Sequence, residues 1–148
     1  MTDLPADFLF LNNQFCFVLY AASRKMIQQY TPMLKVLDLT YTQYIVLLVL
    51  WEHHKLPVKK LGEYLMLDTG TLTPLLKKLE KKELITRTRS AEDERSVLIE
   101  LTDKGEELKS DASRLSPELL CSIPLDSKKI VDMREGLRSF LVDLNQCE

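Results

Sequence analysis

The chain has 148 residues, of which 45% are hydrophobic and 28% are charged, and its formal net charge at pH 7 is −2. This length and composition are typical of one globular domain, which we expect over residues 1–148. No stretch is apolar for long enough to cross a bilayer, and no basic segment leads into an apolar one near the N-terminus. We therefore expect a cytoplasmic protein without membrane contacts.

Cysteine and histidine are too few and too scattered to predict a disulfide framework or a metal site. Cys16, Cys121 and Cys147 are an odd number, lie far apart and form no C-x-x-C pair. His53 and His54 are adjacent, and adjacent side chains diverge on a helix, so we interpret them as a solvated helix end. We expect neither a metal nor another cofactor, and we interpret Cys147 as a thiol in a frayed tail.

Charge is distributed unevenly along the chain. The segment 55–82 has seven lysines and three acidic residues, whereas the segment 100–148 has eleven acidic and seven basic residues. A positive middle section is either a solvated charge run or a face that meets phosphate.

Residues 7–31 predict a first helix with more apolar surface than one buried face needs. A partner subunit would cover this surface better than a small monomer could. Asn12 or Asn13 is a suitable N-cap for a helix with Cys16 in its first turn. From the residues alone, Cys16 is either a small packed side chain or a reactive thiol. The apolar side chains near helical spacing are Phe8, Phe15, Leu19, Ala22, Met26 and Tyr30, and others are Leu11, Phe17 and Val18.

Two further helices are predicted by their apolar patterns. Residues 41–52 are almost continuously apolar up to Trp51, and the C-terminal segment carries apolar residues three and four apart. We expect helices within residues 7–31 and 103–146 to form a dimerisation layer beside a lobe of residues 40–102. The C-terminal positions are Ile130, Met133, Leu137, Leu141 and Leu144.

Residues 57–82 predict a helix-turn-helix. Two short apolar stripes flank the turn "DTG", and the second helix is basic on its outer side. Asp68 and Thr69 are good N-cap types, and Pro74 is tolerable near the first turn. The inward residues are Val58, Leu61, Tyr64 and Leu65, then Leu72, Leu75, Leu76 and Leu79, and the outward ones are Lys77, Lys78, Lys81 and Lys82.

Residues 84–101 predict a β-hairpin, the wing of a winged helix. The β-prone runs 85–89 and 96–101 flank the polar turn "SAEDER". An arginine at a hairpin tip can enter the minor groove of DNA. Asp93 and Glu94 would hold the Arg95 guanidinium in a fixed fork, unless the whole turn is a solvated charge cluster.

The candidate DNA contacts follow from these elements. We expect groove contacts from the second helix, a wing-tip contact from Arg95, and phosphate contacts from Lys59 and Lys60. The groove set is Thr69, Thr71, Thr73, Lys77 and Lys78, and the wing set is Arg87, Arg89, Asp93 and Arg95. We count the N-cap residue Asp68 with the DNA-binding residues as well.

At these residues the sequence resembles the MarR family of winged helix-turn-helix regulators. The wing pattern appears as Asp93, Arg95, Leu101 and Thr102, followed by Gly105. The organic hydroperoxide regulators (OhrR) are more similar still, and the likeness runs from about residue 12 to the C-terminal helix. The motifs that carry it are "NQFCFVLYAASR", "LTYTQYIVLLVLWE", "LGEYLMLDTGTLTPLLKKLE" and "EDERSVLIELT".

This resemblance implies a mainly α-helical homodimer with a small β-hairpin wing, which represses transcription from an inverted repeat in double-stranded DNA. It implies that Cys16 senses organic hydroperoxide, that Tyr30 and Tyr41 bind near its sulfur, and that Tyr20 lies one turn beyond it. Phe15 and Phe17 would supply an apolar vestibule for an alkyl tail. The resemblance also implies that Cys121 resolves the oxidised sulfur of the partner subunit by a disulfide.

Three other functions fit parts of the sequence. A MarR-type repressor released by a small aromatic ligand would leave Cys16 incidental. A thiol peroxidase lacks an arginine beside Cys16, because Arg24 is two turns away, and it needs no basic helix. A protein-binding module leaves the threonine-lysine helix unexplained. We therefore expect a regulator rather than an enzyme.

Overall fold

A computed structural model describes residues 7–93, 95–124 and 126–146 of the chain. Cys147 and Glu94, for which we predicted roles in the tail and the wing turn, lie outside the described residues. Within them, no helix is both long enough and apolar enough to span a membrane. The elements are η1 (Leu11–Asn13), α1 (Phe15–Gln29), α2 (Thr31–Val36), α3 (Tyr41–His53), β1 (Lys55–Pro57), α4 (Val58–Leu65), α5 (Thr69–Lys81), β2 (Ile85–Arg89), β3 (Val97–Leu101), α6 (Asp103–Ser122) and α7 (Ser127–Asn145).

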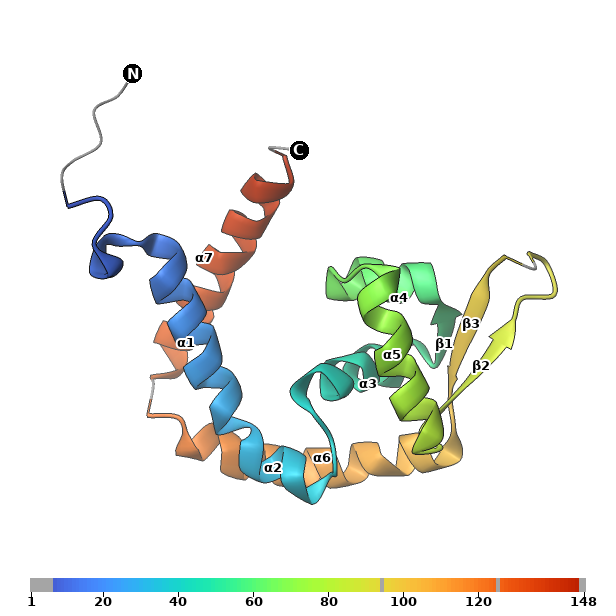
Figure 1. Cartoon of the computed structure of the whole chain (residues 1–148). Coiled ribbons are helices and arrows are strands. Elements are labelled where there is room, and N and C mark those ends of the chain that lie inside the picture. Colours follow the sequence, from blue (N-terminus) through green and yellow to red (C-terminus); the bar gives the residue numbers. More distant parts are fainter. Residues whose placement is uncertain (1–6, 94, 125, 147–148) are drawn as a thin grey trace.

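The elements form two parts joined by the long helix α6 (Figure 1). Helices α3, α4 and α5 form a lobe with the three strands at one end of α6. At the other end, α1 and α7 lie side by side, and the rings of Phe15 and Phe140 meet edge to face with centroids 5.3 Å apart. The predicted mainly helical fold with a β-hairpin wing is therefore confirmed.

The wing belongs to a three-stranded antiparallel sheet in the order β1-β3-β2. Ile85 pairs with Leu101, and Arg89 pairs with Val97, as the predicted hairpin requires. We did not predict β1, which pairs Leu56 with Ile99 on the other side of β3. Its three residues are too few to give an alternating pattern, and their partners lie more than forty residues away.

The core lies in the lobe, where leucines of the helix-turn-helix pack against α3 and the sheet. Leu61, Leu72 and Leu79 are fully buried, as their spacing predicts. Tyr64 was predicted to be buried but is 56% exposed, and its ring stacks on His53 instead, with centroids 4.7 Å apart. The remaining large, fully buried side chains are Val46, Leu47, Leu50, Leu76, Ile85 and Ile99.

The N-terminal part of the first predicted helix is not α-helical. Residues 7–14 form turns and the short η1, and α1 begins at Phe15. Neither asparagine caps α1, because its N-cap is Gln14, whose side chain makes no capping bond. Asn13 instead donates from Nδ2 to the Asp7 backbone oxygen at 2.9 Å and to Asp7 Oδ2 at 3.1 Å. These local side-chain bonds compete with helix formation.

Candidate nucleic-acid interface and thiol site

The N-terminus of α5 is fixed by Asp68, as predicted. Asp68 Oδ1 accepts a hydrogen bond of 2.8 Å from the Thr71 backbone N–H, and Oδ2 accepts one of 2.7 Å from the Thr71 hydroxyl. The Thr71 hydroxyl is the largest cause that lowers the pKa of Asp68, followed by the Thr71 backbone N–H. The carboxylate is thus ionised at neutral pH, and the start of the helix has one defined geometry.

The exposed face of α5 carries the predicted threonines and lysines. Thr69, Lys77 and Lys78 are exposed, whereas Thr73 is half-buried and donates its hydroxyl proton to the Thr69 carbonyl at 2.8 Å. Pro74 is the sixth residue of α5. It therefore lies beyond the first turn, where we expected it to be tolerated. Lys82, predicted to point outward, binds Asp38 Oδ2 at 2.9 Å, which ties the end of α5 to the turn before α3.

Several predicted DNA contacts surround one hollow between α4, α5 and the wing. This hollow measures about 280 Å³. Lys60 is not part of it: its Nζ pairs with Glu63 Oε2 at 2.6 Å within α4, and the hydrogen bond to Glu63 is the main reason that the pKa of Lys60 is raised. Arg89, Asp93, Lys77 and Lys78 also lie outside the hollow. Its predicted lining residues are Lys59, Thr69, Thr73, Arg87 and Arg95.

The wing turn is shaped by backbone contacts. Asp93 Oδ1 accepts a bond of 3.0 Å from the Arg95 backbone N–H, and Ser90 Oγ accepts bonds from the backbone N–H groups of Glu92 and Asp93. We predicted that Asp93 would hold the Arg95 guanidinium, but among the described residues it forms no such ion pair. A short carboxylate reaches its neighbouring backbone more easily than the end of a long side chain.

Arg87 has a partner that sequence reasoning missed. Its Nε and Nη2 lie 2.8 Å and 2.7 Å from Glu80 Oε2, so the guanidinium of β2 is paired with the last turn of α5. The signal available in the sequence was the sign of the charge, since Glu80 is the acidic residue of an otherwise basic helix.

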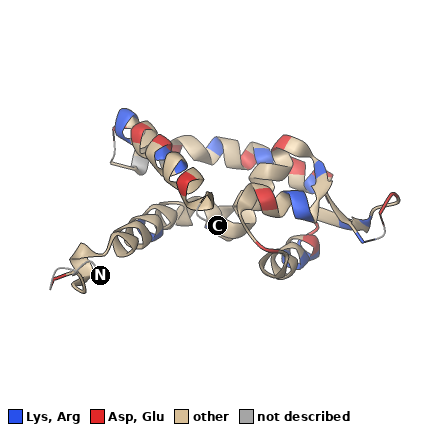
Figure 2. Cartoon of the chain, turned by 90° about the horizontal axis from the view of Figure 1, so that it is seen from above, with Lys and Arg blue, Asp and Glu red and all other residues tan. Residues whose placement is uncertain are grey.

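Cys16 is the second residue of α1 and is exposed. Its surroundings are apolar on one side: Phe15 packs on Phe140, and Phe17 is half-buried. Tyr20 lies one turn further along, but the Arg24 guanidinium stacks over its ring at 5.4 Å. Figure 2 shows that charged residues are few along α1, in contrast to α6 and α7.

Tyr30 and Tyr41 lie together, but away from Cys16 of the same chain. Their ring centroids are 5.3 Å apart, and Tyr44 packs against both at 6.1 Å and 6.5 Å. Burial, and next the neighbouring phenol of Tyr30, raise the pKa of Tyr41, so its hydroxyl remains a proton donor. Tyr30 lies fourteen positions after Cys16, which at a helical rise of 1.5 Å per residue is about 21 Å.

Cys121 is exposed in the last turn of α6. Phe15, next to Cys16, contacts Phe140, which lies thirteen residues into α7 and thus about 20 Å from Ser127. Figure 1 shows that α7 begins beside the end of α6, at the opposite end of the α1–α7 pair from the start of α1. A disulfide needs Cα atoms within about 7 Å, so this fold does not bring Cys16 and Cys121 of one chain together.

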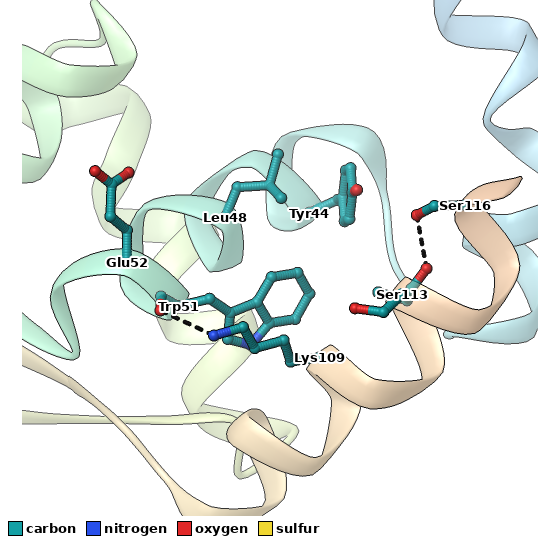
Figure 3. Close-up of a pocket in the computed structure, with 8 residues that line it drawn as sticks. Tyr44, Leu48, Trp51, Glu52, Lys109, Ser113 and Ser116 are labelled. Atoms are coloured by element: carbon teal, nitrogen blue, oxygen red, sulfur yellow. Dashed lines mark hydrogen bonds between the residues drawn. The ribbon is translucent and has the colours of Figure 1, made fainter. Parts of the chain in front are cut away.

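A second hollow, of about 400 Å³, lies between α3 and α6 (Figure 3). Trp51 and Tyr44 form its aromatic wall, and the Lys109 ammonium at its edge donates to the Trp51 backbone oxygen at 3.3 Å. We call this space the α3–α6 hollow. Tyr44 also belongs to the cluster of Tyr30, Tyr41 and Tyr44, so the hollow borders that cluster. The other lining residues are Leu48, Glu52, Ala112, Ser113 and Ser116.

The matching family model and the relative that follows are both described as transcriptional regulators. Residues 28–112 match the family model described as transcriptional regulator SarA/Rot. The organic hydroperoxide resistance transcriptional regulator of Bacillus subtilis is 49% identical over 140 residues, which cover 95% of each chain.

Two solved structures of the protein AbfR are also similar. The structure of reduced AbfR bound to DNA is 31% identical, has a TM-score of 0.83, and the match covers 97% of this chain and 98% of that one. The structure of AbfR with a formed disulfide is 33% identical, has a TM-score of 0.62, and the match covers 92% of this chain and 90% of that one.

Proposed function

Because this chain belongs to the SarA/Rot-type transcriptional regulators, which are MarR-like winged-helix proteins that bind DNA, we propose that it is a repressor whose affinity for operator DNA depends on its redox state. It binds an inverted repeat as a homodimer and leaves when an organic hydroperoxide oxidises Cys16. The observation that carries this proposal is the exposed Cys16 thiol in the first turn of α1, on an apolar surface that its own chain leaves uncovered.

The homodimer is supported by the apolar side chains that remain exposed on the N-terminal segment and on α7. Neither α1 nor α7 has a fully buried residue within the described chain. A surface of this kind is typical of an interface between subunits. Its members are Phe8, Leu9, Phe10, Leu11, Phe15 and Val18, together with Val131, Met133, Leu137, Leu141, Val142 and Leu144.

On DNA, α5 of each subunit enters the major groove, and the two helices are spaced by about one helical turn, or roughly 34 Å. The exposed threonines and lysines of α5 meet base edges and phosphates, Lys59 meets phosphate, and Arg95 at the wing enters the minor groove. The hollow that Lys59, Thr73 and Arg95 share supports this arrangement, because it brings the helix and the wing to one surface.

The thiol site is formed by two subunits. Tyr30 and Tyr41 are too far from Cys16 of their own chain, so the phenols that bind near its sulfur are those of the partner subunit. The raised pKa of Tyr41 keeps its phenol a proton donor and supports this role. Cys16 is the second residue of α1 and so lies in the first turn of that helix.

Oxidation proceeds in balanced steps. The Cys16 thiolate attacks the terminal oxygen of the hydroperoxide, the O–O bond breaks, and the alkoxide leaves and takes a proton to become an alcohol. The sulfur is then a sulfenic acid. The Cys121 thiol of the partner subunit condenses with it to give a disulfide and water. An alkyl tail against Phe15 and Phe17 gains about 0.8 kcal/mol per buried CH₂, which favours organic over hydrogen peroxide.

The new disulfide requires α1 of one subunit to approach the end of the partner's α6. Since α6 also carries the DNA-binding lobe, this movement rotates the two recognition helices out of register. A loss of about 4 kcal/mol in operator binding corresponds to a roughly thousandfold weaker affinity.

The test is fluorescence anisotropy on an inverted-repeat duplex selected by the reduced wild-type protein. Titration with cumene hydroperoxide releases the wild type, whereas Cys16→Ser stays bound. Cys121→Ser stays bound unless a small thiol is added to react with the sulfenic acid. The proposal is wrong if Cys16→Ser is released at the same peroxide concentration as the wild type.

The α3–α6 hollow supports a second candidate function, release by a small aromatic ligand. Trp51 and Tyr44 offer ring faces, and Lys109 offers a positive charge at the edge. In this case Cys16→Ser would still leave the operator when salicylate or a similar aromatic acid is added, and Trp51→Leu would not.

A further inference from the structure

Glu80 is an acidic residue on a helix whose other charged residues are all basic. Lys77, Lys78 and Lys81 share α5 with it. On a surface that meets phosphate, a carboxylate repels the ligand, so a role in direct DNA contact does not account for Glu80. The Glu80 carboxylate must therefore act on another residue of the protein.

The structure shows what Glu80 contacts. Both Nε and Nη2 of Arg87 lie within 2.8 Å of Glu80 Oε2. The Arg87 side chain is 26% exposed and that of Glu80 is 37% exposed, so they are more sheltered than most ion pairs among the described residues. An arginine held in this way, partly out of water, does not present a free positive charge.

This ion pair joins the recognition helix to the wing. Between its partners the chain turns through Glu83, which has a positive φ of 62°, and the buried residues Leu84 and Ile85 anchor the root of β2. From that root the wing runs about six residues to its tip, or roughly 20 Å at 3.4 Å per residue. A rotation of about 10° at the root would therefore displace the tip by about 3.5 Å, which is more than the length of a hydrogen bond.

We propose that the Glu80–Arg87 ion pair is a brace that sets the angle between the recognition helix and the wing. The brace fixes the separation of the major-groove contacts of α5 from the minor-groove contact of Arg95. Arg87 is thus a positioning residue that acts through Glu80, in contrast to the direct phosphate contact that its charge predicts. The inference rests on the docking of α5 and the wing described above and is independent of Cys16.

The sign of one mutational effect separates the two roles. Glu80→Gln removes a negative charge beside the DNA and frees Arg87, so if Arg87 contacts phosphate, affinity for DNA rises. If the pair is a brace, the same substitution loosens the wing and weakens binding to the inverted repeat. Binding to a duplex of random sequence, which depends mainly on charge, then stays the same or becomes tighter.

The experiment is a double-mutant cycle in the reduced protein with Glu80→Gln, Arg87→Gln and both together. Anisotropy is measured on the selected inverted repeat and on random duplex, at several salt concentrations. We expect each single variant to bind the inverted repeat about tenfold more weakly, and the double variant no more weakly than either. We also expect hydroxyl-radical protection of the minor groove to be lost while major-groove protection by α5 remains.

Glu63→Gln is the matched control. Like Glu80, Glu63 forms an ion pair within the lobe, with Lys60 at 2.6 Å. Both partners lie on α4, however, so this pair joins no second element. This variant should bind the inverted repeat as tightly as the wild type or more tightly. Urea unfolding of all variants checks that the lobe remains folded.

Two results would overturn the brace. One is a Glu80→Gln variant that binds the inverted repeat as well as, or better than, the wild type. The other is an Arg87→Gln variant whose salt dependence falls by about one charge while Glu80→Gln has no effect, which is the signature of a phosphate contact. If α5 does not dock on the inverted repeat at all, the wild type gives no major-groove protection, and that failure is seen before any variant is tested.

Discussion

The indole N–H of Trp51 donates a hydrogen bond of 2.8 Å to the backbone oxygen of Gly105, and this buried bond joins α3 to the first turn of α6. It links the lobe of α3, α4, α5 and the strands to the helix that leads to the α1–α7 pair. Gly105 N–H in turn donates to the Thr102 hydroxyl at 3.1 Å. The joint between the two parts of the molecule is therefore held by polar bonds as well as by packing.

Trp51→Phe removes the indole donor and leaves the Gly105 oxygen buried without that partner. Because Gly105 lies in the first turn of α6, its oxygen still accepts the backbone hydrogen bond of that helix. The loss is therefore that of one net hydrogen bond, about 0.5–1.5 kcal/mol, and we expect the free energy of unfolding to fall by this amount in urea titrations. Leu48→Ala, on an exposed position of the same helix, is the control and should cost less. An unchanged unfolding midpoint for Trp51→Phe would show that the bond contributes nothing to stability.

Gly105 and Gly136 should respond in opposite ways to alanine. A Cβ on Gly105 would overlap the Leu84 carbonyl oxygen and lie 2.8 Å from Leu101 Cδ1, whereas a Cβ on Gly136 would meet nothing within 4 Å. Gly136→Ala should stabilise α7 by about 0.5–1 kcal/mol. Gly105→Ala should lower the melting temperature because the wing root must shift. Equal melting temperatures for the two variants would contradict this prediction.

Patterns that repeat within one element predicted most of the fold. The leucine spacing of α4 and α5 and the β-prone runs of the wing gave elements whose bounds agree with the structure to within about two residues. The prediction that Tyr64 is buried was wrong because the eight residues of α4 are too few to distinguish its buried face from the edge of that face. The stacking partner of Tyr64, His53, lies on another helix.

Contacts between distant elements were not predictable from the sequence in the same way. The pairing of Arg87 with Glu80 depends on the path of the turn between them, and the separation of Cys16 from Tyr30 depends on α1 being one straight helix. The resemblance predicted which residues belong to the thiol site and that Cys121 acts on the partner subunit, but it did not indicate which subunit provides Tyr30 and Tyr41. The roles of these residues, and of the DNA contacts, stay predictions.

The Asp68 carboxylate makes the stability of the lobe depend on pH in acid. Its pKa is lowered from 3.8, chiefly by the Thr71 hydroxyl. A lowered pKa means that the stabilisation is fully present above the unfolded value and is lost as the pH falls from 3.8 through the folded value. We therefore expect the stability difference between the wild type and Asp68→Asn, measured by urea unfolding, to be present at pH 7 and to shrink below pH 3.8. A difference that grows in acid would contradict this assignment.

Mixed dimers test whether the thiol site is shared between subunits. One chain carries Cys16→Ser and the other carries Tyr30→Phe and Tyr41→Phe. If the phenols act across the interface, the mixed dimer has one complete site, formed by Cys16 of the tyrosine variant and the phenols of the serine variant. It should then form sulfenic acid at about the wild-type rate per complete site, measured by trapping with dimedone, while both parent homodimers react slowly or not at all. If the phenols act within one chain, every Cys16 in the mixture lies beside phenylalanines, and mixing restores nothing. The separation of Cys16 and Tyr30 by fourteen positions along α1, about 21 Å, predicts the first result.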